Sequence, residues 1–158
     1  MSAPVVSLVI VNYNGERYLP DCLASLSALD WPAEALDVIV VDNASSDDSR
    51  ALIARQYPAA RVLPQAYNTG FAPACYIGAR AARGEHLAFL NNDLRVAPDW
   101  LRAMTAPLVG APADLVCVAS TIRSWDGRLV DFVGGALNAY GRAFQRDQGL
   151  PYDPAFYR

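Results

Sequence analysis

The chain has 158 residues, which is enough for one domain with a substantial hydrophobic core. Its content of 53% hydrophobic and 18% charged residues is typical of a folded globular protein and excludes a disordered one. The formal net charge of -3 excludes the basic field by which proteins attract nucleic acid or an anionic membrane. All thirteen basic residues are Arg, so chemistry that depends on a lysine nucleophile is excluded as well.

The N-terminus has neither a charged region nor the apolar core of a signal peptide. No apolar run is long enough to span a membrane, so we expect no transmembrane segment. Cys22, Cys75 and Cys117 are far apart and lack zinc spacing, which favours small buried residues in a reducing compartment. We therefore expect a cytoplasmic protein, with peripheral attachment to the inner face of the membrane left open.

Short apolar runs alternate with segments of helical periodicity over the first 120 residues. In chain order we predict a strand at 6–11, a helix at 18–29, a strand at 36–41, a helix at 47–57, a strand at 61–63, a helix at 72–83, a strand at 86–90, a helix that begins at 98 and a strand at 114–121. This alternation predicts an α/β fold, with a mostly parallel sheet and helices on both faces.

The regular pattern fades after residue 121. Asp126-Gly127 is typical of a hairpin turn, and further glycines indicate a loop-rich, irregular C-terminal tail. We therefore divide the chain into an α/β domain at 1–121 and the beginning of a second region at 122–158.

Three polar segments follow predicted strands: residues 12–15, 42–46 and 91–93. The carboxyl ends of parallel strands meet at one edge of a sheet, and ligands bind there in open α/β folds. The candidate binding residues are Asn12, Tyr13, Asn14, Asp42, Asn43, Asn68, Gly70, Asn91, Asn92 and Asp93.

For Asp42 and for the loop at Asn68 and Gly70, a functional and a structural interpretation both stay open. Asp42 either accepts a hydrogen bond from a nucleotide base or bonds its own backbone in a turn. The loop at Asn68 and Gly70, before a predicted helix, either binds an anionic or hydroxyl-rich group or forms a β-turn that places Phe71 in the core.

Asp93 is the candidate metal ligand. One protein carboxylate, two diphosphate oxygens and waters would complete the octahedral coordination of Mg²⁺ or Mn²⁺, since Mg²⁺ rarely uses an all-protein cage. The alternative is an Asn-Asn-Asp turn without a metal. His86 is interpreted as structural, because no carboxylate pattern accompanies it.

Four motifs in order carry a family resemblance: VIVNYNG at 9–15, VVDNASSD at 40–47, NTGF at 68–71 and FLNND at 89–93. Together they resemble the family 2 glycosyltransferases with a GT-A (Rossmann-like) fold, and most closely the rhamnosyltransferase-like subgroup. The resemblance covers about residues 6 to 110.

The resemblance implies a nucleotide-diphosphate sugar donor, UDP- or dTDP-linked, a divalent metal, and inverting transfer to a glycan or lipid-linked acceptor in polysaccharide synthesis. By this resemblance Asp42 matches the base-binding aspartate, residues 12–14 match the ribose loop, and Asn68 and Gly70 border the donor. Asp93 matches the metal-binding aspartate, whereas Asn91 stands where many relatives have Asp.

The chain departs from the family at the catalytic base. Inverting members use a downstream carboxylate that must reach the acceptor hydroxyl, and no acidic residue after Asp93 matches that motif. We therefore expect the donor-binding part of a longer enzyme, cut short or a natural fragment, in which exposed apolar surface would favour self-association. The alternative is a noncatalytic nucleotide-binding or interaction module of the same fold.

Overall fold

The computed structural model describes residues 3–137, 139–140 and 142–157. It consists of two compact units, Met1–Arg102 and Ala103–Arg158. The predicted division near residue 121 stays a prediction.

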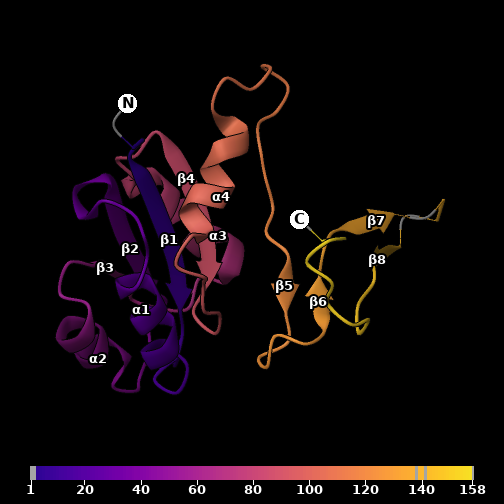
Figure 1. Ribbon diagram of the computed structural model, residues 1–158. Helices are drawn as coiled ribbons and strands as arrows, with labels where there is room; N and C mark the ends of the chain where they lie inside the picture. The colour runs from indigo at the N-terminus through magenta and orange to yellow at the C-terminus, as the bar shows by residue number, and fades with distance from the viewer. Residues whose placement is uncertain (1–2, 138, 141, 158) are drawn as a thin grey trace. The chain divides into compact units, whose positions relative to one another are not determined.

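The first unit is built on a parallel sheet of four strands, β1 (Val6–Asn12), β2 (Leu36–Asp42), β3 (Arg61–Pro64) and β4 (His86–Asn91). The strand order is β3-β2-β1-β4, so β1 and β2 occupy the centre (Figure 1). β1 is in register with both neighbours, and Asn12 pairs with Asp42 while Val11 pairs with Asn91. The carboxyl ends of β1, β2 and β4 therefore lie side by side at one edge of the sheet.

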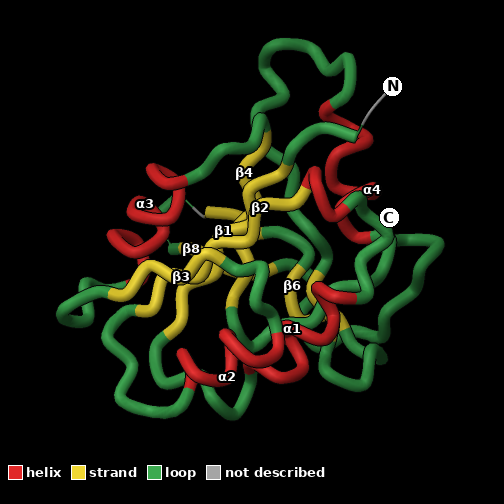
Figure 2. Tube along the Cα trace, turned by 90° about the vertical axis from the view of Figure 1, so that its left-hand side faces the viewer, coloured by secondary structure: helices red, strands yellow, loops and turns green. Residues whose placement is uncertain are grey.

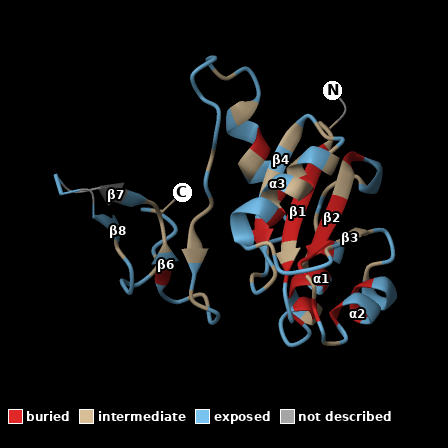
Figure 3. Cartoon of the chain, turned by 180° about the vertical axis from the view of Figure 1, so that it is seen from behind, coloured by how far each residue is buried: buried red, intermediate tan, exposed pale blue. Residues whose placement is uncertain are grey.

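Helices cover both faces of this sheet (Figure 2). Helices α1 (Leu19–Ser27) and α2 (Ser49–Gln56) pack on one face, and α3 (Phe71–Ala81) packs on the other. Side chains alternate between the faces along each strand, and β1 and β2 are buried on both sides (Figure 3). This burial explains why both strands have nearly continuous apolar sequences. The predicted α/β fold with helices on both faces is confirmed.

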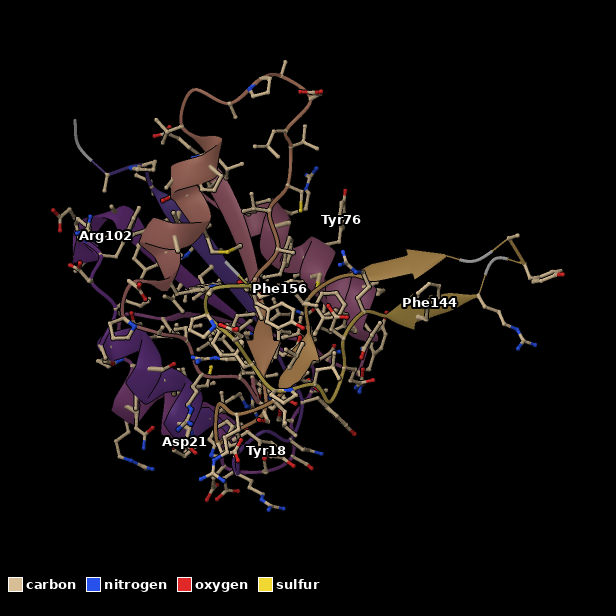
Figure 4. All side chains as sticks on the ribbon, turned by 45° about the vertical axis from the view of Figure 1, so that its right-hand side comes forward. Tyr18, Asp21, Tyr76, Arg102, Phe144 and Phe156 are labelled. Atoms are coloured by element: carbon tan, nitrogen blue, oxygen red, sulfur yellow. The ribbon has the colours of Figure 1, made fainter. Side chains whose placement is uncertain are left out.

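The two faces differ in what the helices contribute. On the α1 and α2 face, Leu23, Leu26 and Ile53 pack against Leu8, Ile10, Val38 and Val40. On the other face Ala74 and Gly78 of α3 are buried, with Ala74 packed against Val9, Ile39 and Val41, whereas Tyr76 points away from the sheet (Figure 4). Small residues on the buried side of α3 allow the helix to approach the sheet closely.

A polar cluster on the α3 face ties three segments together. Ser7 donates a hydrogen bond to Asp37 at 2.8 Å, and Arg61 pairs with the same carboxylate at 2.9 Å. The backbone N–H groups of Arg83 and Gly84 donate to Ser7 Oγ at 3.0 and 2.8 Å. Each polar group buried in this cluster thereby has a partner, which limits the cost of removing it from water.

The remaining elements of the chain are short. A 3₁₀ turn, η1 (Ala33–Ala35), precedes β2; α4 (Trp100–Thr105) and η2 (Ala106–Leu108) follow β4. The second unit has two small antiparallel pairs, β5 (Ile122–Arg123) with β6 (Val130–Phe132) and β7 (Gly135–Leu137) with β8 (Ala143–Gln145).

The predicted strand at 114–121 is wrong. Residues 114–121 have no regular structure, and Leu115 and Val116 are exposed. An apolar run forms a strand only where a neighbouring strand satisfies its backbone, and none is paired with this segment in the described residues. The turn predicted at Asp126-Gly127 does connect two antiparallel strands, β5 and β6, and Gly127 has a φ of 76°.

No helix among the described residues is both long enough and apolar enough to cross a membrane.

Candidate functional site

The polar segments after β1, β2 and β4 meet at the carboxyl edge of the sheet. The Asn12 side chain, on the central strand, connects the other two segments. Its Nδ2 donates to Asp42 Oδ1 at 3.2 Å, and its Oδ1 accepts a hydrogen bond from Asn92 Nδ2 at 2.8 Å. Segments that are separated by up to 80 residues in the sequence are thus joined by direct side-chain contacts.

A cavity of about 490 Å³ opens at this edge of the first unit. Its volume is within the range of sites for small molecules and cofactors. Seven of the residues predicted from the sequence line it: Tyr13, Asn43, Asn68, Gly70, Asn91, Asn92 and Asp93. Val11 and Phe71 complete the lining.

Asn12, Asn14 and Asp42 are the predicted residues that do not line the cavity. Asn12 and Asp42 are fully buried, and strand alternation places them on the face covered by α1 and α2, together with Ile10 and Val40. The cavity instead lies beside Val11 and Asn91, which belong to the α3 face. In this conformation Asp42 is therefore behind the cavity wall.

Asp42 has one carboxylate oxygen without a hydrogen bond. Oδ1 accepts from Asn12, whereas the buried Oδ2 accepts no hydrogen bond within the part of the chain that the structure describes. The nearest cation is Arg50, whose Nε lies 3.5 Å from Oδ2 and whose side chain is 58% exposed. A buried carboxylate with a free acceptor position and an exposed counter-ion is suited to accept a hydrogen bond from a ligand N–H.

Asn14 shapes the loop after β1. It has a left-handed backbone with a φ of 49°, which asparagine tolerates better than most residues. Its Oδ1 accepts from the Ser46 backbone at 2.8 Å, and its own N–H donates to Ser45 Oγ at 3.0 Å. The side chain thus joins the loops after β1 and β2.

Asp47 acts at the N-terminus of α2, two residues before the first residue of the helix. Its Oδ1 accepts from the Ser49 backbone at 3.1 Å and its Oδ2 from Glu16 at 3.0 Å. Burial raises the pKa of the Asp47 carboxyl, but hydrogen bonds from Ser49 and Glu16 outweigh this effect, so the pKa is lowered.

Asn43 holds the loop that forms one wall of the cavity. Its Nδ2 donates to Asn68 Oδ1 at 2.8 Å and to the Gly70 carbonyl at 3.2 Å. Its Oδ1 accepts from the backbone and the hydroxyl of Thr69 at 2.9 and 3.0 Å. Gly70 has a φ of 86°, a backbone conformation that glycine adopts more readily than other residues. All of the hydrogen-bonding positions of the Asn43 amide are therefore occupied.

Asp93 lies at the rim of the cavity with its side chain exposed. Among the described residues no cation forms an ion pair with it. Burial raises the pKa of the neighbouring Cys22 thiol to about 12, and the negative charge of Asp93 contributes to this increase. The carboxylate is therefore a free negative charge beside the cavity.

The chemistry of the cavity wall is compatible with one metal ion and one anionic ligand. Within the part of the chain that the structure describes, the lining contains one carboxylate and several amides, but no Arg. No cluster of three or more His, Cys, Asp or Glu exists in residues 3–137, 139–140 and 142–157, so a cage built from the described residues alone is excluded. Mg²⁺ does not require such a cage, because it keeps waters and is completed by substrate phosphates.

Two contributions to the site were missed from the sequence. Phe71 was named only in the structural alternative, which placed it in the core; it is 60% exposed and lines the cavity. It is the first residue of α3 and, three and seven residues before Ala74 and Gly78, lies in phase with the buried side of the helix, so the helical periodicity gave no signal of its exposure. Arg50 was not considered at all, although it is the second residue of the helix that follows the Asp42 segment.

Comparison with known proteins supplies the family. The model of glycosyl transferase family 2 matches residues 7–157. The glycosyltransferase AglE of Haloferax volcanii is 32% identical over 117 residues, which cover 72% of this chain and 38% of AglE. The succinoglycan biosynthesis protein ExoO of Rhizobium meliloti is 33% identical over 126 residues, covering 79% of this chain and 36% of ExoO.

A solved structure agrees with the fold. The mannosyltransferase PcManGT of Pyrobaculum calidifontis, in complex with GDP-Man and Mn²⁺, superimposes with a TM-score of 0.62 at 26% identity. The similarity covers 78% of this chain and 38% of that protein. The chain thus spans little more than a third of the length of each of these relatives. Since the family model extends over nearly all of the chain, the chain belongs to glycosyl transferase family 2.

Proposed function

We propose that this chain is the donor-binding part of an inverting glycosyltransferase. The complete enzyme would transfer a sugar from a nucleotide-diphosphate sugar to a glycan or lipid-linked hydroxyl acceptor in polysaccharide or glycolipid synthesis. The observation that carries this proposal is the cavity at the carboxyl edge of the sheet, with the unpaired Asp93 at its rim. The cytoplasmic location, a division near residue 121 and the rhamnosyltransferase-like subgroup are parts of the same proposal.

The charges around the cavity support a metal-bound diphosphate. A diphosphate placed beside Asp93 would be repelled, because no Arg of the described residues lines the cavity to compensate its charge. A divalent cation between the two removes this repulsion, and one carboxylate with diphosphate oxygens is a common magnesium environment. Asp93 would hold Mg²⁺ or Mn²⁺, with Asn91 as a second oxygen ligand. When bound, the metal would neutralise the negative charge that develops on the departing diphosphate.

The other residues of the wall would bind and orient the donor. The N-terminus of α3, at Gly70 and Phe71, adds backbone N–H groups and a positive helix end to the cavity wall. Tyr13 is 51% exposed and offers its ring to a base or a ribose. Asp42 Oδ2 would accept the imide N–H of uracil or thymine once the exposed Arg50 side chain moves aside.

Similarity to PcManGT supports this assignment, since that protein is known in complex with GDP-Man and Mn²⁺. The similarity to ExoO, a succinoglycan biosynthesis protein, supports polysaccharide synthesis as the setting. We propose a UDP- or dTDP-sugar as the donor. The experiment must also include a guanine nucleotide, so that its binding can be compared with that of UDP and dTDP.

Calorimetric titration of the chain with UDP, dTDP and GDP, each with Mn²⁺ and with EDTA, tests the proposal. We expect one nucleotide to bind more tightly with Mn²⁺ and the Asp93→Ala variant to lose only this metal-dependent gain. Asp99→Ala is the matched control, because Asp99 is an acidic residue of the same unit that does not line the cavity. If Asp93→Ala weakens binding equally in EDTA, the metal role is wrong.

A noncatalytic module is the second candidate. Asp99 is the single acidic residue between Asp93 and the end of the first unit, and it does not line the cavity. A catalytic base must lie within hydrogen-bond reach of the acceptor hydroxyl. Nucleotide binding without donor hydrolysis or transfer would favour the module, whereas turnover by the 158-residue chain would exclude it.

A further inference from the structure

The buried amide of Asn12 occupies a central position between the two ends of the proposed donor site. The residue is fully buried, and its Nδ2 donates to Asp42 Oδ1 at 3.2 Å and to Ser45 Oγ at 3.0 Å. Its Oδ1 accepts from Asn92 at 2.8 Å. Both N–H groups are therefore engaged within the protein and the oxygen accepts one hydrogen bond there, so no N–H of Asn12 remains for a ligand.

The Asp42 carboxylate determines how this amide is oriented. An ionised carboxylate only accepts hydrogen bonds, so the nitrogen of Asn12 must face it. The oxygen of Asn12 then faces Asn92, which must in turn present its own Nδ2. Because Asn92 belongs to the cavity wall, its Oδ1 is then the acceptor that it can offer to a ligand.

Gly15 provides an independent indication that this contact is tightly enclosed. A Cβ atom added to Gly15 would fall on Asn12 Oδ1 and Asn92 Nδ2, the two atoms of the hydrogen bond. Any larger residue at position 15 would therefore separate Asn12 from Asn92. The loop after β1 approaches so closely only because it has no side chain at this point.

We propose that Asn12 is a positioning residue that fixes residues 91–93 relative to Asp42. Asn12 bonds the Asp42 carboxylate behind the cavity on one side and Asn92 on the other. It thereby fixes the position of the segment that carries Asp93, without touching the donor. The inference rests on the proposed function, because residues 91–93 matter to a ligand only if they hold the metal-bound diphosphate.

Hydrogen exchange and calorimetry on the 158-residue chain test the inference. The variants are Asn12→Ser, Asn92→Ala and the double variant; Asn92 is only half-buried, so its variant keeps the test open if Asn12→Ser does not fold. Backbone amides of residues 91–96 report the position of the segment, and those of β3 serve as the internal control. The ligand probe is the nucleotide among UDP, dTDP and GDP that binds with Mn²⁺.

We expect both single variants to exchange faster over residues 91–96 and to bind the probe about tenfold more weakly, the factor for one lost buried hydrogen bond. The double variant should be no weaker than the weaker single variant, because both remove the same contact. Unchanged exchange in Asn92→Ala, or losses in the two single variants that multiply in the double variant, would overturn the inference. Failure of the wild-type chain to bind any of the three nucleotides would refute the proposed function instead, and the exchange data would still decide the role of Asn12.

Discussion

Removal of the Asn43 side chain should release the wall of the cavity that Asn68, Thr69 and Gly70 form. Asn43 is 2% exposed and makes four hydrogen bonds to this loop, at 2.8 to 3.2 Å. In Asn43→Ala the partners in the loop can turn to water, so each bond should be worth the lower part of the usual range, about 0.5–1 kcal/mol. The sum predicts a loss of about 2–4 kcal/mol in the free energy of unfolding, a substantial part of the stability of a small domain.

Urea denaturation measures this loss, and hydrogen exchange of residues 66–71 locates it. Tyr67→Ala is the matched control in the same loop, since Tyr67 is 71% exposed and its variant should stay within about 0.5 kcal/mol of the wild type. We expect faster exchange in the loop for Asn43→Ala and little change for the control. A loss below about 0.5 kcal/mol in Asn43→Ala, with unchanged exchange, would refute the view that Asn43 holds the loop.

Three further predictions concern the rest of the first unit. Burial raises the pKa of Asp37, but the hydrogen bonds from Arg61 and Ser7 and the charge of Arg61 outweigh burial and lower it. The wild type should therefore be more stable than Asp37→Asn near neutral pH, and urea denaturation should show this advantage shrinking as the pH falls below about 4; a constant difference would contradict the pairing. Ala44 has a φ of 68°, so Ala44→Gly should raise the free energy of unfolding by about 0.5–1 kcal/mol in the same assay, and a loss would show that its Cβ packs usefully. The Cys22 thiol, with its pKa near 12, should resist iodoacetamide at pH 8 in the native chain, and rapid labelling read by mass spectrometry would disprove its burial.

Much of the fold could be predicted because the central strands of the sheet are buried, and buried strands have recognisably apolar sequences. β1 and β2 are buried on both faces, so their apolar runs are nearly uninterrupted and identify them without ambiguity. The apolar run at 114–121 was misread because a sequence does not reveal whether a partner strand exists. Its exposed residues Leu115 and Val116 show that apolar composition alone is insufficient.

The convergence of the polar strand ends on one cavity could also be predicted, but not the orientation of each side chain. The rule that strand ends share an edge correctly brought Asn43, Asn91 and Asp93 to one cavity. It did not distinguish the faces of the sheet, and so it grouped Asn12 and Asp42 with residues that line the cavity. Strand alternation was the missed signal, because both residues are in phase with apolar side chains that face α1 and α2.

The hydrogen-bond networks behind the wall could not have been predicted at all. They depend on contacts between residues far apart in sequence, such as Asn12 with Asn92 and Asn43 with Thr69. A buried amide and an exposed amide look the same in a sequence, and only the packing around them separates a residue that positions a loop from one that contacts a ligand.

A crystal structure of the chain soaked with UDP-, dTDP- and GDP-sugars and Mn²⁺ would test the central claim most directly. The proposal predicts a diphosphate in the cavity at the carboxyl edge of the sheet, with the anomalous signal of manganese beside the Asp93 carboxylate. Nucleotide bound elsewhere on the chain, or manganese bound away from Asp93 while the cavity stays free of ligand, would contradict it.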